Sequence, residues 1–505
     1  MANLYSLIAA SLQAQPARIV LAGEHREFTG AQLDQQAGRY AAALRSLGLA
    51  SGERMAVQVD KSADNVLLYL ACLRLGAIYL PLNTAYQSSE VDYFLQDASP
   101  RILVATSARA GELATVAQRN SVATLLTLDA NATGTLPELV ATQRESVEAV
   151  ARCDDDLAVI CYTSGTTGRS KGAMISHGNL ISNAQRLVQL WGFAASDVLL
   201  HALPLYHIHG LFVALHCALL SGAKVLLHAR FDAPMVLRSL PEATVLMGVP
   251  TFYTRLLADP QLQAPLVRHM RVFISGSAPL LSETFNEFEQ RTGHRILERY
   301  GMTETGMISS NPLLGERRAG SVGKPLPDVE VSVLDEHGAA LPRGEVGVIA
   351  VRGPNVARGY WQMPDKTAAD FRADGYFMTG DLGCMDADGY LHLVGRAKDL
   401  IISGGLNVYP KEIEAVLDAL APVEESAVFA LPHSDLGETV AAAIVLKRSA
   451  TRIAPEQMQD HIIAAVRQQL AGFKIPRRVF ILDELPRNAM GKVQKAVLRE
   501  RFGGK

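Results

Sequence analysis

The sequence predicts an α/β protein with a large N-terminal domain and a small, mobile α+β C-terminal domain. The large domain is expected to contain two doubly wound α/β subdomains and a β-barrel-like subdomain. Two observations predict this fold. The chain has 505 residues, which is more than one hydrophobic core usually holds, so it should divide into several units. Short apolar runs also alternate with helix-like stretches, as in parallel sheets covered by helices on both faces.

Two series of strands and helices account for the doubly wound subdomains. Strands of the first series are expected at residues 53–59, 77–82, 102–105 and 122–126, and residues 67–75 have helical spacing. Strands of the second series are expected at residues 198–200, 224–227, 245–249 and 271–275. Helical stretches separate the strands in both series, which is typical of βαβ units.

The pattern changes after Ser321. Residues 329–334 and 347–351 alternate as strands around a turn-forming run, which predicts an antiparallel meander. The tail is expected to contain a helix at 411–420, strands at 425–431 and 439–446, and a helix at 455–471. It has roughly 110 residues, an ordinary size for a domain. We therefore predict two domains, 1–396 and 397–505.

Composition excludes several classes of function. The net charge is −3, with 20% charged residues, so the chain lacks the basic field that nucleic-acid binding requires. An odd, scattered set of five cysteines fits reduced thiols in the cytoplasm. No Lys or Arg precedes Arg18, which argues against a signal or transit peptide. The apolar stretch 198–220 contains Pro204 and four histidines, so it is expected to be buried core beside a pocket rather than a membrane span.

Residues 163–172 surround Lys171 with hydroxyls and glycines. The spacing is not that of a Walker A loop, in which Lys directly follows Gly. Small residues nevertheless let backbone N–H groups approach a phosphate, and hydroxyls donate to its oxygens. A flexible surface loop is the alternative. A second basic segment holds Lys492 near the C-terminus, where domain motion could deliver or withdraw it. Together the two segments point to activation of a carboxylate by ATP.

Two carboxylates lie in further polar segments. Glu304 follows Thr303 and could hold Mg²⁺, which binds one or two carboxylates together with phosphate oxygens; a carboxylate at a helix start is the alternative. Asp381 follows an apolar strand and could accept hydrogen bonds from ribose hydroxyls, although it could also be an ordinary turn residue. Farther along, Gly404 and Gly405 permit close approach of the backbone to another surface.

These segments, in this order, resemble the acyl- and aryl-CoA synthetases of the adenylate-forming superfamily, which includes luciferases and peptide-synthetase adenylation domains. The resemblance covers nearly the whole chain and rests on residues 163–172, 300–304, 376–381, 395–399, 404–405 and Lys492. It implies a reaction in two steps. A substrate carboxylate attacks the α-phosphorus of Mg·ATP to give an acyl-adenylate and pyrophosphate, and the thiol of coenzyme A then expels AMP.

The resemblance also implies roles for individual residues. The β- and γ-phosphates would lie against Thr163, Ser164, Gly165, Thr166, Thr167, Gly168 and Lys171. The adenine and its surroundings would be framed by Gly276, Ser277, Ala278, Glu298, Arg299, Tyr300, Gly301 and Met302. Thr303 would contact the α-phosphate, Glu304 and Thr166 the Mg²⁺, and Asp381 and Arg396 the ribose. Lys492 would be catalytic with Thr303 and Glu304, because it neutralises charge as carboxylate and phosphate approach. Lys398 would act as the hinge, and Ser403, Gly404 and Gly405 would line the CoA tunnel after the small domain rotates.

Within that family, the chain is most similar to malonyl-CoA synthetases. The shared runs are residues 201–211, 247–257 and 273–280. Malonate keeps a second carboxylate after the first is adenylated, and a buried pocket would pair it best with Arg. Arg255 is the expected anchor, with His207 and Ser277 as polar neighbours. A solvent-exposed Arg255 at the end of a helix is the alternative, and Arg299 is a second candidate. The sequence does not separate malonate from methylmalonate.

Other functions remain open at this point. They are a synthetase for another short acid, an adenylation module that feeds a carrier protein, and a non-catalytic nucleotide-binding regulator. The combination of Lys492, Glu304 and Asp381 argues against the regulator. The resemblance further implies that a lysine acetyltransferase could act on Lys492, since acetylation would remove its charge. No nucleic-acid or membrane partner is expected.

Overall fold

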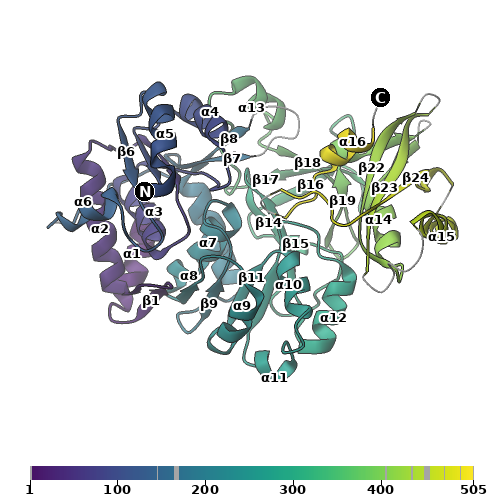
Figure 1. Cartoon of the computed structure of the whole chain (residues 1–505), viewed down its shortest axis with the longest axis horizontal. Helices are drawn as coiled ribbons and strands as arrows, with labels where there is room; N and C mark the ends of the chain where they lie inside the picture. The colour runs from purple at the N-terminus through teal and green to yellow at the C-terminus, as the bar shows by residue number, and fades with distance from the viewer. Residues whose placement is uncertain are drawn as a thin grey trace. The chain divides into compact units, whose positions relative to one another are not determined.

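The chain folds into two compact units (Figure 1). The computed structural model describes residues 3–144, 146–163, 170–403, 406–433, 436–447, 455–470, 472–488 and 491–503. Unit 1 comprises Met1–Ala319, Gly323–Glu330 and Val351–Phe377, and unit 2 comprises Gly320–Val322, Val331–Ala350 and Met378–Lys505. Residues 378–396 thus pack with the C-terminal part. The two units divide the chain differently from the domain boundary predicted after residue 396, which stays a prediction.

The first sheet of unit 1 has the strand order β6-β5-β3-β4-β7-β8. Its strands are β3 (Arg54–Gln58), β4 (Ile78–Pro81), β5 (Ile102–Ala105), β6 (Thr124–Thr127), β7 (Leu157–Thr163) and β8 (Lys171–Ser176). All neighbours are parallel except β7 and β8, which form an antiparallel hairpin. This confirms the first predicted series of βαβ units. Its central strands are apolar throughout because helices cover both faces of a parallel sheet.

The second sheet of unit 1 has the order β15-β14-β13-β12-β11-β9-β10-β1-β2. Its strands are β1 (Ile19–Ala22), β2 (Glu27–Thr29), β9 (Val198–His201), β10 (Lys224–Leu227), β11 (Val245–Gly248), β12 (Val272–Ser275), β13 (Leu297–Met302), β14 (Gly306–Ser310) and β15 (Lys324–Pro325). The strands from β1 to β13 in this order are parallel, which confirms the second series. The sequence did not indicate β1, which joins the sheet by pairing with the distant β10.

Helices cover the sheets of unit 1. They are α1 (Leu4–Ala14), α2 (Gly30–Ser46), α3 (Ala63–Leu75), α4 (Ser88–Ala98), α5 (Ser107–Arg119), α6 (Thr135–Ala141), α7 (His177–Leu190), α8 (Leu215–Ser221), α9 (Ala233–Ser239), α10 (Pro250–Leu257), α11 (Ala264–Val267), α12 (Ser282–Thr292) and α13 (Pro364–Asp370). Within the described ranges, no helix is both long enough and apolar enough to cross a membrane.

Helix α3 is buried along its whole length. It starts at Ser62, whose side chain accepts from the backbone N–H of Asn65. It ends at Gly76, which adopts φ +66° and so terminates the helix in the left-handed region that favours glycine. Because all its faces are covered, its residues are mostly apolar. The helix is therefore part of the core rather than a surface layer.

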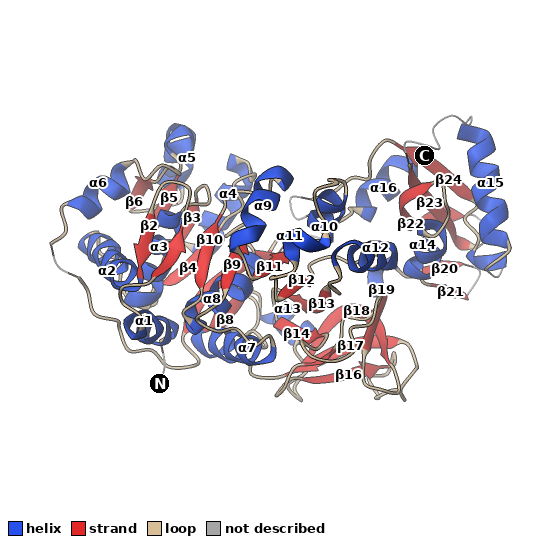
Figure 2. Cartoon of the chain, turned by 90° about the horizontal axis from the view of Figure 1, so that it is seen from below, coloured by secondary structure: helices blue, strands red, loops and turns tan. Residues whose placement is uncertain are grey.

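Unit 2 contains two sheets, and its helices alternate with the strands of the second sheet (Figure 2). Strands β16 (Glu330–Leu334), β17 (Gly347–Arg352), β18 (Phe377–Met385) and β19 (Leu391–Arg396) lie in that order in one sheet, as the meander predicted. A second sheet has the order β21-β20-β23-β22, with β24 parallel to β23. Its strands are β20 (Ile401–Ser403), β21 (Leu406–Val408), β22 (Val423–His433), β23 (Gly437–Leu446) and β24 (Arg478–Leu482).

The helices of unit 2 cover the two faces of its second sheet. They are α14 (Pro410–Asp418), α15 (Pro455–Arg467) and α16 (Lys495–Phe502). Ile413 of α14 and Ile462 of α15 lie in one apolar cluster with the sheet. Leu498 of α16 belongs to a separate cluster with Phe429 of β22. This α+β arrangement agrees with the predicted tail.

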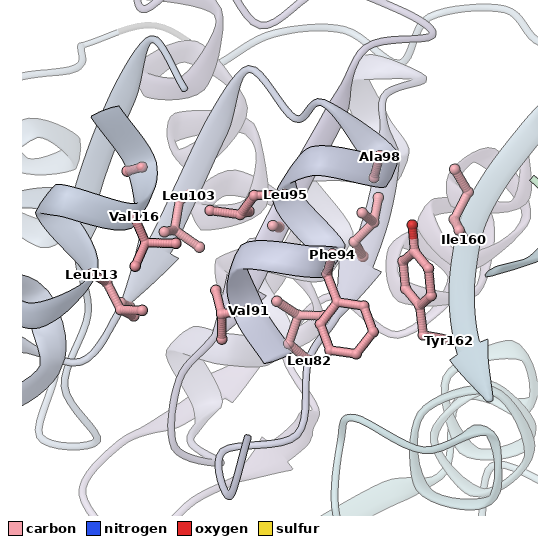
Figure 3. Close-up of a cluster of buried hydrophobic side chains, with 14 of the residues drawn as sticks. Leu82, Val91, Phe94, Leu95, Ala98, Leu103, Leu113, Val116, Ile160 and Tyr162 are labelled. Atoms are coloured by element: carbon pink, nitrogen blue, oxygen red, sulfur yellow. The ribbon is translucent and has the colours of Figure 1, made fainter. Parts of the chain in front are cut away.

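An apolar cluster lies on the first sheet of unit 1 (Figure 3). It joins Phe94 of α4 to Leu103 of β5 and Tyr162 of β7. Trp361 packs against the same cluster, and its Nε1 donates to the backbone carbonyl of Asp97 over 3.1 Å. The cluster therefore fixes both the end of β7 and the segment around Trp361.

Replacing Phe94 with Ala should destabilise unit 1 by about 3–5 kcal/mol, because the cavity left by a buried aromatic ring adds to the lost burial. Both tryptophans of the chain, Trp191 and Trp361, belong to unit 1. Urea unfolding followed by tryptophan fluorescence therefore reports on this unit. Phe94→Leu keeps most of the volume and should cost less than half as much. Equal losses in the two variants would contradict the role of the ring.

Candidate functional site

The hairpin of β7 and β8 brings Thr163 and Lys171 together. The two residues are paired across the hairpin, and Thr163 Oγ1 donates to the carbonyl of Lys171 over 3.4 Å. They mark the two ends of the predicted phosphate loop. The predicted contacts Ser164, Gly165, Thr166, Thr167 and Gly168 lie outside the described residues. The structure thus places the start and the end of the predicted loop side by side.

Tyr360 connects Lys171 to Glu304. The Tyr360 hydroxyl donates to Glu304 Oε1 over 3.0 Å and accepts from Lys171 Nζ over 3.2 Å. Lys171 Nζ also lies 4.3 Å from the centroid of the Tyr360 ring and 3.3 Å from Asp370 Oδ2. The sequence singled out Lys171 and Glu304 but neither Tyr360 nor Asp370. Their roles are visible only once the chain is folded, because 56 positions separate Tyr360 from Glu304 and 189 separate it from Lys171.

The Tyr360 phenol is a hydrogen-bond donor at any ordinary pH. Burial raises its pKa above the usual value, and the nearby carboxylates of Glu304 and Asp370 raise this pKa further. Glu304 itself is only 5% exposed. The hydroxyl therefore stays protonated beside a carboxylate that has little access to solvent.

The turn that carries Glu304 is held by buried amides. Asn183 of α7 accepts from the N–H of Met307 and donates to its carbonyl, over 3.1 and 2.9 Å. Asn355 also donates to the Met307 carbonyl, and the N–H of Ala357 donates to the carbonyl of Glu304 over 2.7 Å. These hydrogen bonds fix the backbone at Glu304 and at Met307, three positions later. Thr303 precedes Glu304 in this turn.

The predicted adenine segments lie on neighbouring parallel strands. Gly276 to Ala278 follow β12, and Glu298 to Tyr300 belong to β13; these strands are paired at Ser275 and Glu298. Gly301 and Met302 end β13. The Oε1 of Glu298 accepts from the N–H of Leu280 over 3.1 Å. The segments therefore meet at the carboxyl ends of parallel strands, where ligands of open α/β sheets bind.

Arg299 provides a buried positive charge beside these segments. The residue is 2% exposed, and its Nε and Nη2 have no hydrogen-bond partner among the described residues. Burial lowers its pKa to about 9, so the guanidinium is still predominantly charged at neutral pH. A Cβ on Gly276 would lie 2.6 Å from Arg299 Cζ, which leaves no room for another residue there. A buried cation with unused donors is costly unless an anion joins it.

His209 adds a further unused donor near this guanidinium. Its Nδ1 lies 3.2 Å from Ser277 Oγ, and its Nε2 has no partner among the described residues. In the tautomer that accepts from Ser277 at Nδ1, Nε2 carries the hydrogen. Burial lowers the pKa of His209, and the charge of Arg299 lowers it further, so the ring is neutral. Ser277 adopts φ +73°, a strained conformation for a residue other than glycine.

A π-helix positions the histidines of this region. It spans His209–Ala214 and leads directly into α8; such π-turns are frequent at functional sites. His207 Nδ1 accepts from the N–H of His209 over 3.3 Å. The predicted anchor Arg255 lies on α10 with its side chain exposed, so the expectation of a buried Arg255 is corrected. The buried residues of α10 are Pro250, Phe252, Tyr253, Leu256 and Leu257, which leaves position 255 on the solvent face.

In unit 2, Asp381 and Arg396 are cross-strand partners. They pair in the register of β18 and β19, and Arg396 Nε lies 2.6 Å from Asp381 Oδ1. The predicted hinge residue Lys398 follows in the short helix Ala397–Asp399. Burial lowers the pKa of Lys398. Arg499 of α16 binds the neighbouring Asp399 over 2.9 Å, which ties the last helix to the predicted hinge.

Lys492 lies on the exposed part of a hairpin in unit 2. Its N–H donates to Asn488 Oδ1, and its carbonyl accepts from the N–H of Asn488, both over 3.0 Å. Lys495 Nζ lies 2.6 Å from Glu414 Oε1 and attaches the chain after the hairpin to α14. The backbone around Lys492 is therefore held, and the residue itself is exposed.

Of the predicted CoA contacts, Ser403 ends β20 and is 6% exposed. Gly404 and Gly405 lie outside the described residues.

Comparisons with known proteins agree with this geometry. The chain matches the AMP-binding enzyme family over residues 8–361 and the AMP-binding enzyme C-terminal domain over residues 412–492. It is 35% identical over 480 residues to a malonate–CoA ligase from Arabidopsis thaliana, covering 90% of this chain and 78% of that protein. It is also 35% identical over 480 residues to a feruloyl-CoA synthase from Amycolatopsis sp, covering 94% of each.

A solved structure extends the similarity to three dimensions. The crystal structure of ATP-bound MatB from Rhodopseudomonas palustris matches with a TM-score of 0.96 and 49% identity, covering 99% of both chains. A family match that spans most of the chain, together with relatives of this identity and coverage, establishes the relationship. The chain belongs to the AMP-binding enzyme family.

Proposed function

We propose that this protein is an AMP-forming malonyl-CoA synthetase, which joins malonate to coenzyme A through a malonyl-adenylate and releases pyrophosphate and AMP. The observation that carries the proposal is the buried guanidinium of Arg299, whose Nε and Nη2 are without partners among the described residues. The similarity to a malonate–CoA ligase and to ATP-bound MatB supports malonate and ATP as substrates. A cytoplasmic location fits this substrate set.

The spare carboxylate of malonate would pair with Arg299. Two parallel hydrogen bonds from a guanidinium to a carboxylate give both strength and orientation, and His209 Nε2 would add a third donor. A monocarboxylic acid would leave the buried charge unpaired, which is a strong basis for discrimination. The predicted neighbours Ser277 and His207 both contact His209, so they would act by orienting this ring. Arg255 is exposed and is not part of this proposal.

The nucleotide would bind with its phosphates at Lys171, Thr163 and Glu304. Magnesium, when bound, would neutralise charge on the phosphate oxygens, and the carboxylate of Glu304 fits this ion. In the described part of the chain no group of three or more His, Cys, Asp and Glu side chains could hold a metal. Mg²⁺ needs no such group, because one carboxylate, water and substrate phosphates complete its coordination. Thr303 would contact the α-phosphate from the same turn.

Lys492 would enter for adenylation and leave for thioester formation. An ammonium beside the α-phosphorus stabilises the charge that develops as the malonate carboxylate attacks. The thiol of coenzyme A must then reach the acyl carbon from a face that Lys492 would block. Rotation of the C-terminal domain about Lys398 would withdraw Lys492 from the reacting groups. The same rotation would place Ser403, Gly404 and Gly405 along the path of coenzyme A. Asp381 and Arg396 would hold the ribose throughout.

Replacing Lys492 with Ala should abolish adenylation and spare the second half-reaction. Loss of a preorganised positive charge costs on the order of 3 kcal/mol or more, which is at least a hundredfold in rate. Pyrophosphate release measures the first half-reaction, and CoA consumption with supplied malonyl-adenylate measures the second. Arg501→Ala in α16 removes a cation of the same unit and serves as the control. Equal losses in both half-reactions would reject the division of labour.

Replacing Arg299 with Met should raise the KM for malonate by two orders of magnitude or more, since breaking a buried charged pair costs about 3–5 kcal/mol. The KM for acetate, which has no spare carboxylate, should not rise. Arg255→Met is the matched control and should leave both values unchanged. A higher malonate KM in Arg255→Met, with a normal one in Arg299→Met, would restore Arg255 as the anchor.

The function itself is tested by pyrophosphate release with acetate, malonate, methylmalonate, succinate and octanoate. Malonate should give the highest kcat/KM, with succinate far below it because the distance between its carboxylates is longer. Free coenzyme A, rather than a carrier protein, should accept the acyl group. Absence of pyrophosphate release with every acid would support the non-catalytic regulator instead.

A lysine acetyltransferase acting on Lys492 remains part of this proposal, and the exposure of Lys492 is consistent with it. Acetylation would remove the charge that the first half-reaction requires.

A further inference from the structure

Residues 357–361 form a strap between the two nucleotide-site elements of unit 1. At one end, the N–H of Ala357 donates to the carbonyl of Glu304 over 2.7 Å. At the other, Tyr360 forms an antiparallel bridge with Ala173 of β8. The N–H of Trp361 donates to the carbonyl of Gly172 over 2.8 Å. The strap is therefore an added edge of the β7–β8 hairpin, and its position relative to Lys171 is fixed by the backbone.

The Tyr360 hydroxyl has one hydrogen and two carboxylates that compete for it. It donates to Glu304 Oε1, while Asp370 lies close enough to interact with the phenol as well. The lone pairs of the hydroxyl accept from Lys171. A phenol in this position sets the spacing between the ammonium of Lys171 and the carboxylate of Glu304. Neither group can shift without losing its bond to the same oxygen atom.

Asp370 compensates the charge of Lys171. Asp370 ends α13, and its two oxygens lie 3.3 Å from Lys171 Nζ and 2.6 Å from Lys366 Nζ. The Asp370 side chain is 19% exposed and that of Lys171 is 21% exposed, so their attraction is stronger than between fully solvated groups. A phosphate that binds Lys171 must compete with this carboxylate. Asp370 would keep Lys366 as a partner after Lys171 has turned away.

We propose that Tyr360 and Asp370 are positioning residues of the nucleotide site. Tyr360 holds Lys171 and Glu304 at the spacing that Mg·ATP requires. The carboxylate of Asp370 forms an ion pair with the ammonium of Lys171 until phosphate oxygens replace this carboxylate. This inference rests on the proposed function, because it takes Lys171 and Glu304 to face the phosphates and Mg²⁺. Neither residue needs to touch the reacting atoms.

Tyr360→Phe tests the first part, since it keeps the ring over Lys171 and removes only the hydroxyl. Isothermal titration of the full-length chain with ATP, with and without Mg²⁺, gives the gain in affinity that Mg²⁺ provides. We expect this gain to fall roughly tenfold in Tyr360→Phe, as for one hydrogen bond to a charged group. A change that only loosens packing would weaken both titrations equally, and that result would overturn the role of Tyr360.

Tyr5 offers a matched control far along the chain. Its hydroxyl accepts from Arg74 Nη1 and donates to Asp34 Oδ1, both over 2.5 Å, so Tyr5→Phe breaks the same sequence of cation, phenol and carboxylate. Arg74 also lies over the Tyr5 ring, 4.9 Å from its centroid. Tyr5→Phe should leave the gain from Mg²⁺ unchanged. An equal loss in both variants would show a general effect of removing a buried phenol and would also overturn the proposal.

Asp370→Asn tests the second part through a gain rather than a loss. The amide keeps the shape but no longer holds Lys171 by charge, so the Kd for ATP without Mg²⁺ should fall several-fold. Asp365→Asn changes an exposed carboxylate in the first turn of the same helix and should have no effect. A Kd that is unchanged or higher in Asp370→Asn would overturn the role of Asp370, since a residue needed only for folding cannot strengthen binding when altered.

These titrations separate the inference from the proposed function. If the unaltered chain binds ATP but releases no pyrophosphate with any acid, the synthetase function fails while the binding comparisons still decide the roles of Tyr360 and Asp370. If the unaltered chain does not bind ATP, both are overturned.

Discussion

In unit 1, an ammonium group and two carboxylates share a region with little access to water. Under such conditions charges interact strongly, and one left without an opposite charge is costly. Lys171, Glu304 and Asp370 satisfy this constraint through one another and through the hydroxyl of Tyr360. The need to keep these charges paired requires rigid elements around them. The hairpin β7–β8, the turn after β13 and α13 must all be fixed, because a loose element would separate an ion from its partner.

The same constraint is unmet around Arg299. Its guanidinium is as buried as a core residue, yet two of its nitrogens have no acceptor in the described part of the chain. The charges at the proposed nucleotide site thus compensate one another, whereas the guanidinium at the proposed acid site lacks an opposite charge among the described residues. Under the proposed function, a phosphate would replace an existing partner of Lys171. The carboxylate of the acid would instead give Arg299 an opposite charge that it lacks without the ligand.

Much of the fold could be predicted from the sequence, because apolar runs report burial directly. Strands β5 and β10 coincide with the expected residues 102–105 and 224–227. Strand β1 was not predicted, because its four residues join the sheet by pairing with β10, some two hundred positions away in the sequence. Arg255 was assigned to a pocket, although the apolar positions Phe252, Tyr253, Leu256 and Leu257 together form a face of α10 that leaves position 255 on the opposite side. Tyr360 could not be found in this way, because nothing local distinguishes it from an ordinary core aromatic.

Gly276 limits how the proposed acid site could be redesigned. The guanidinium of Arg299 fills the space where any larger residue would place its first carbon. Libraries that diversify this position in search of new acyl substrates would displace the cation before they reshaped the cavity.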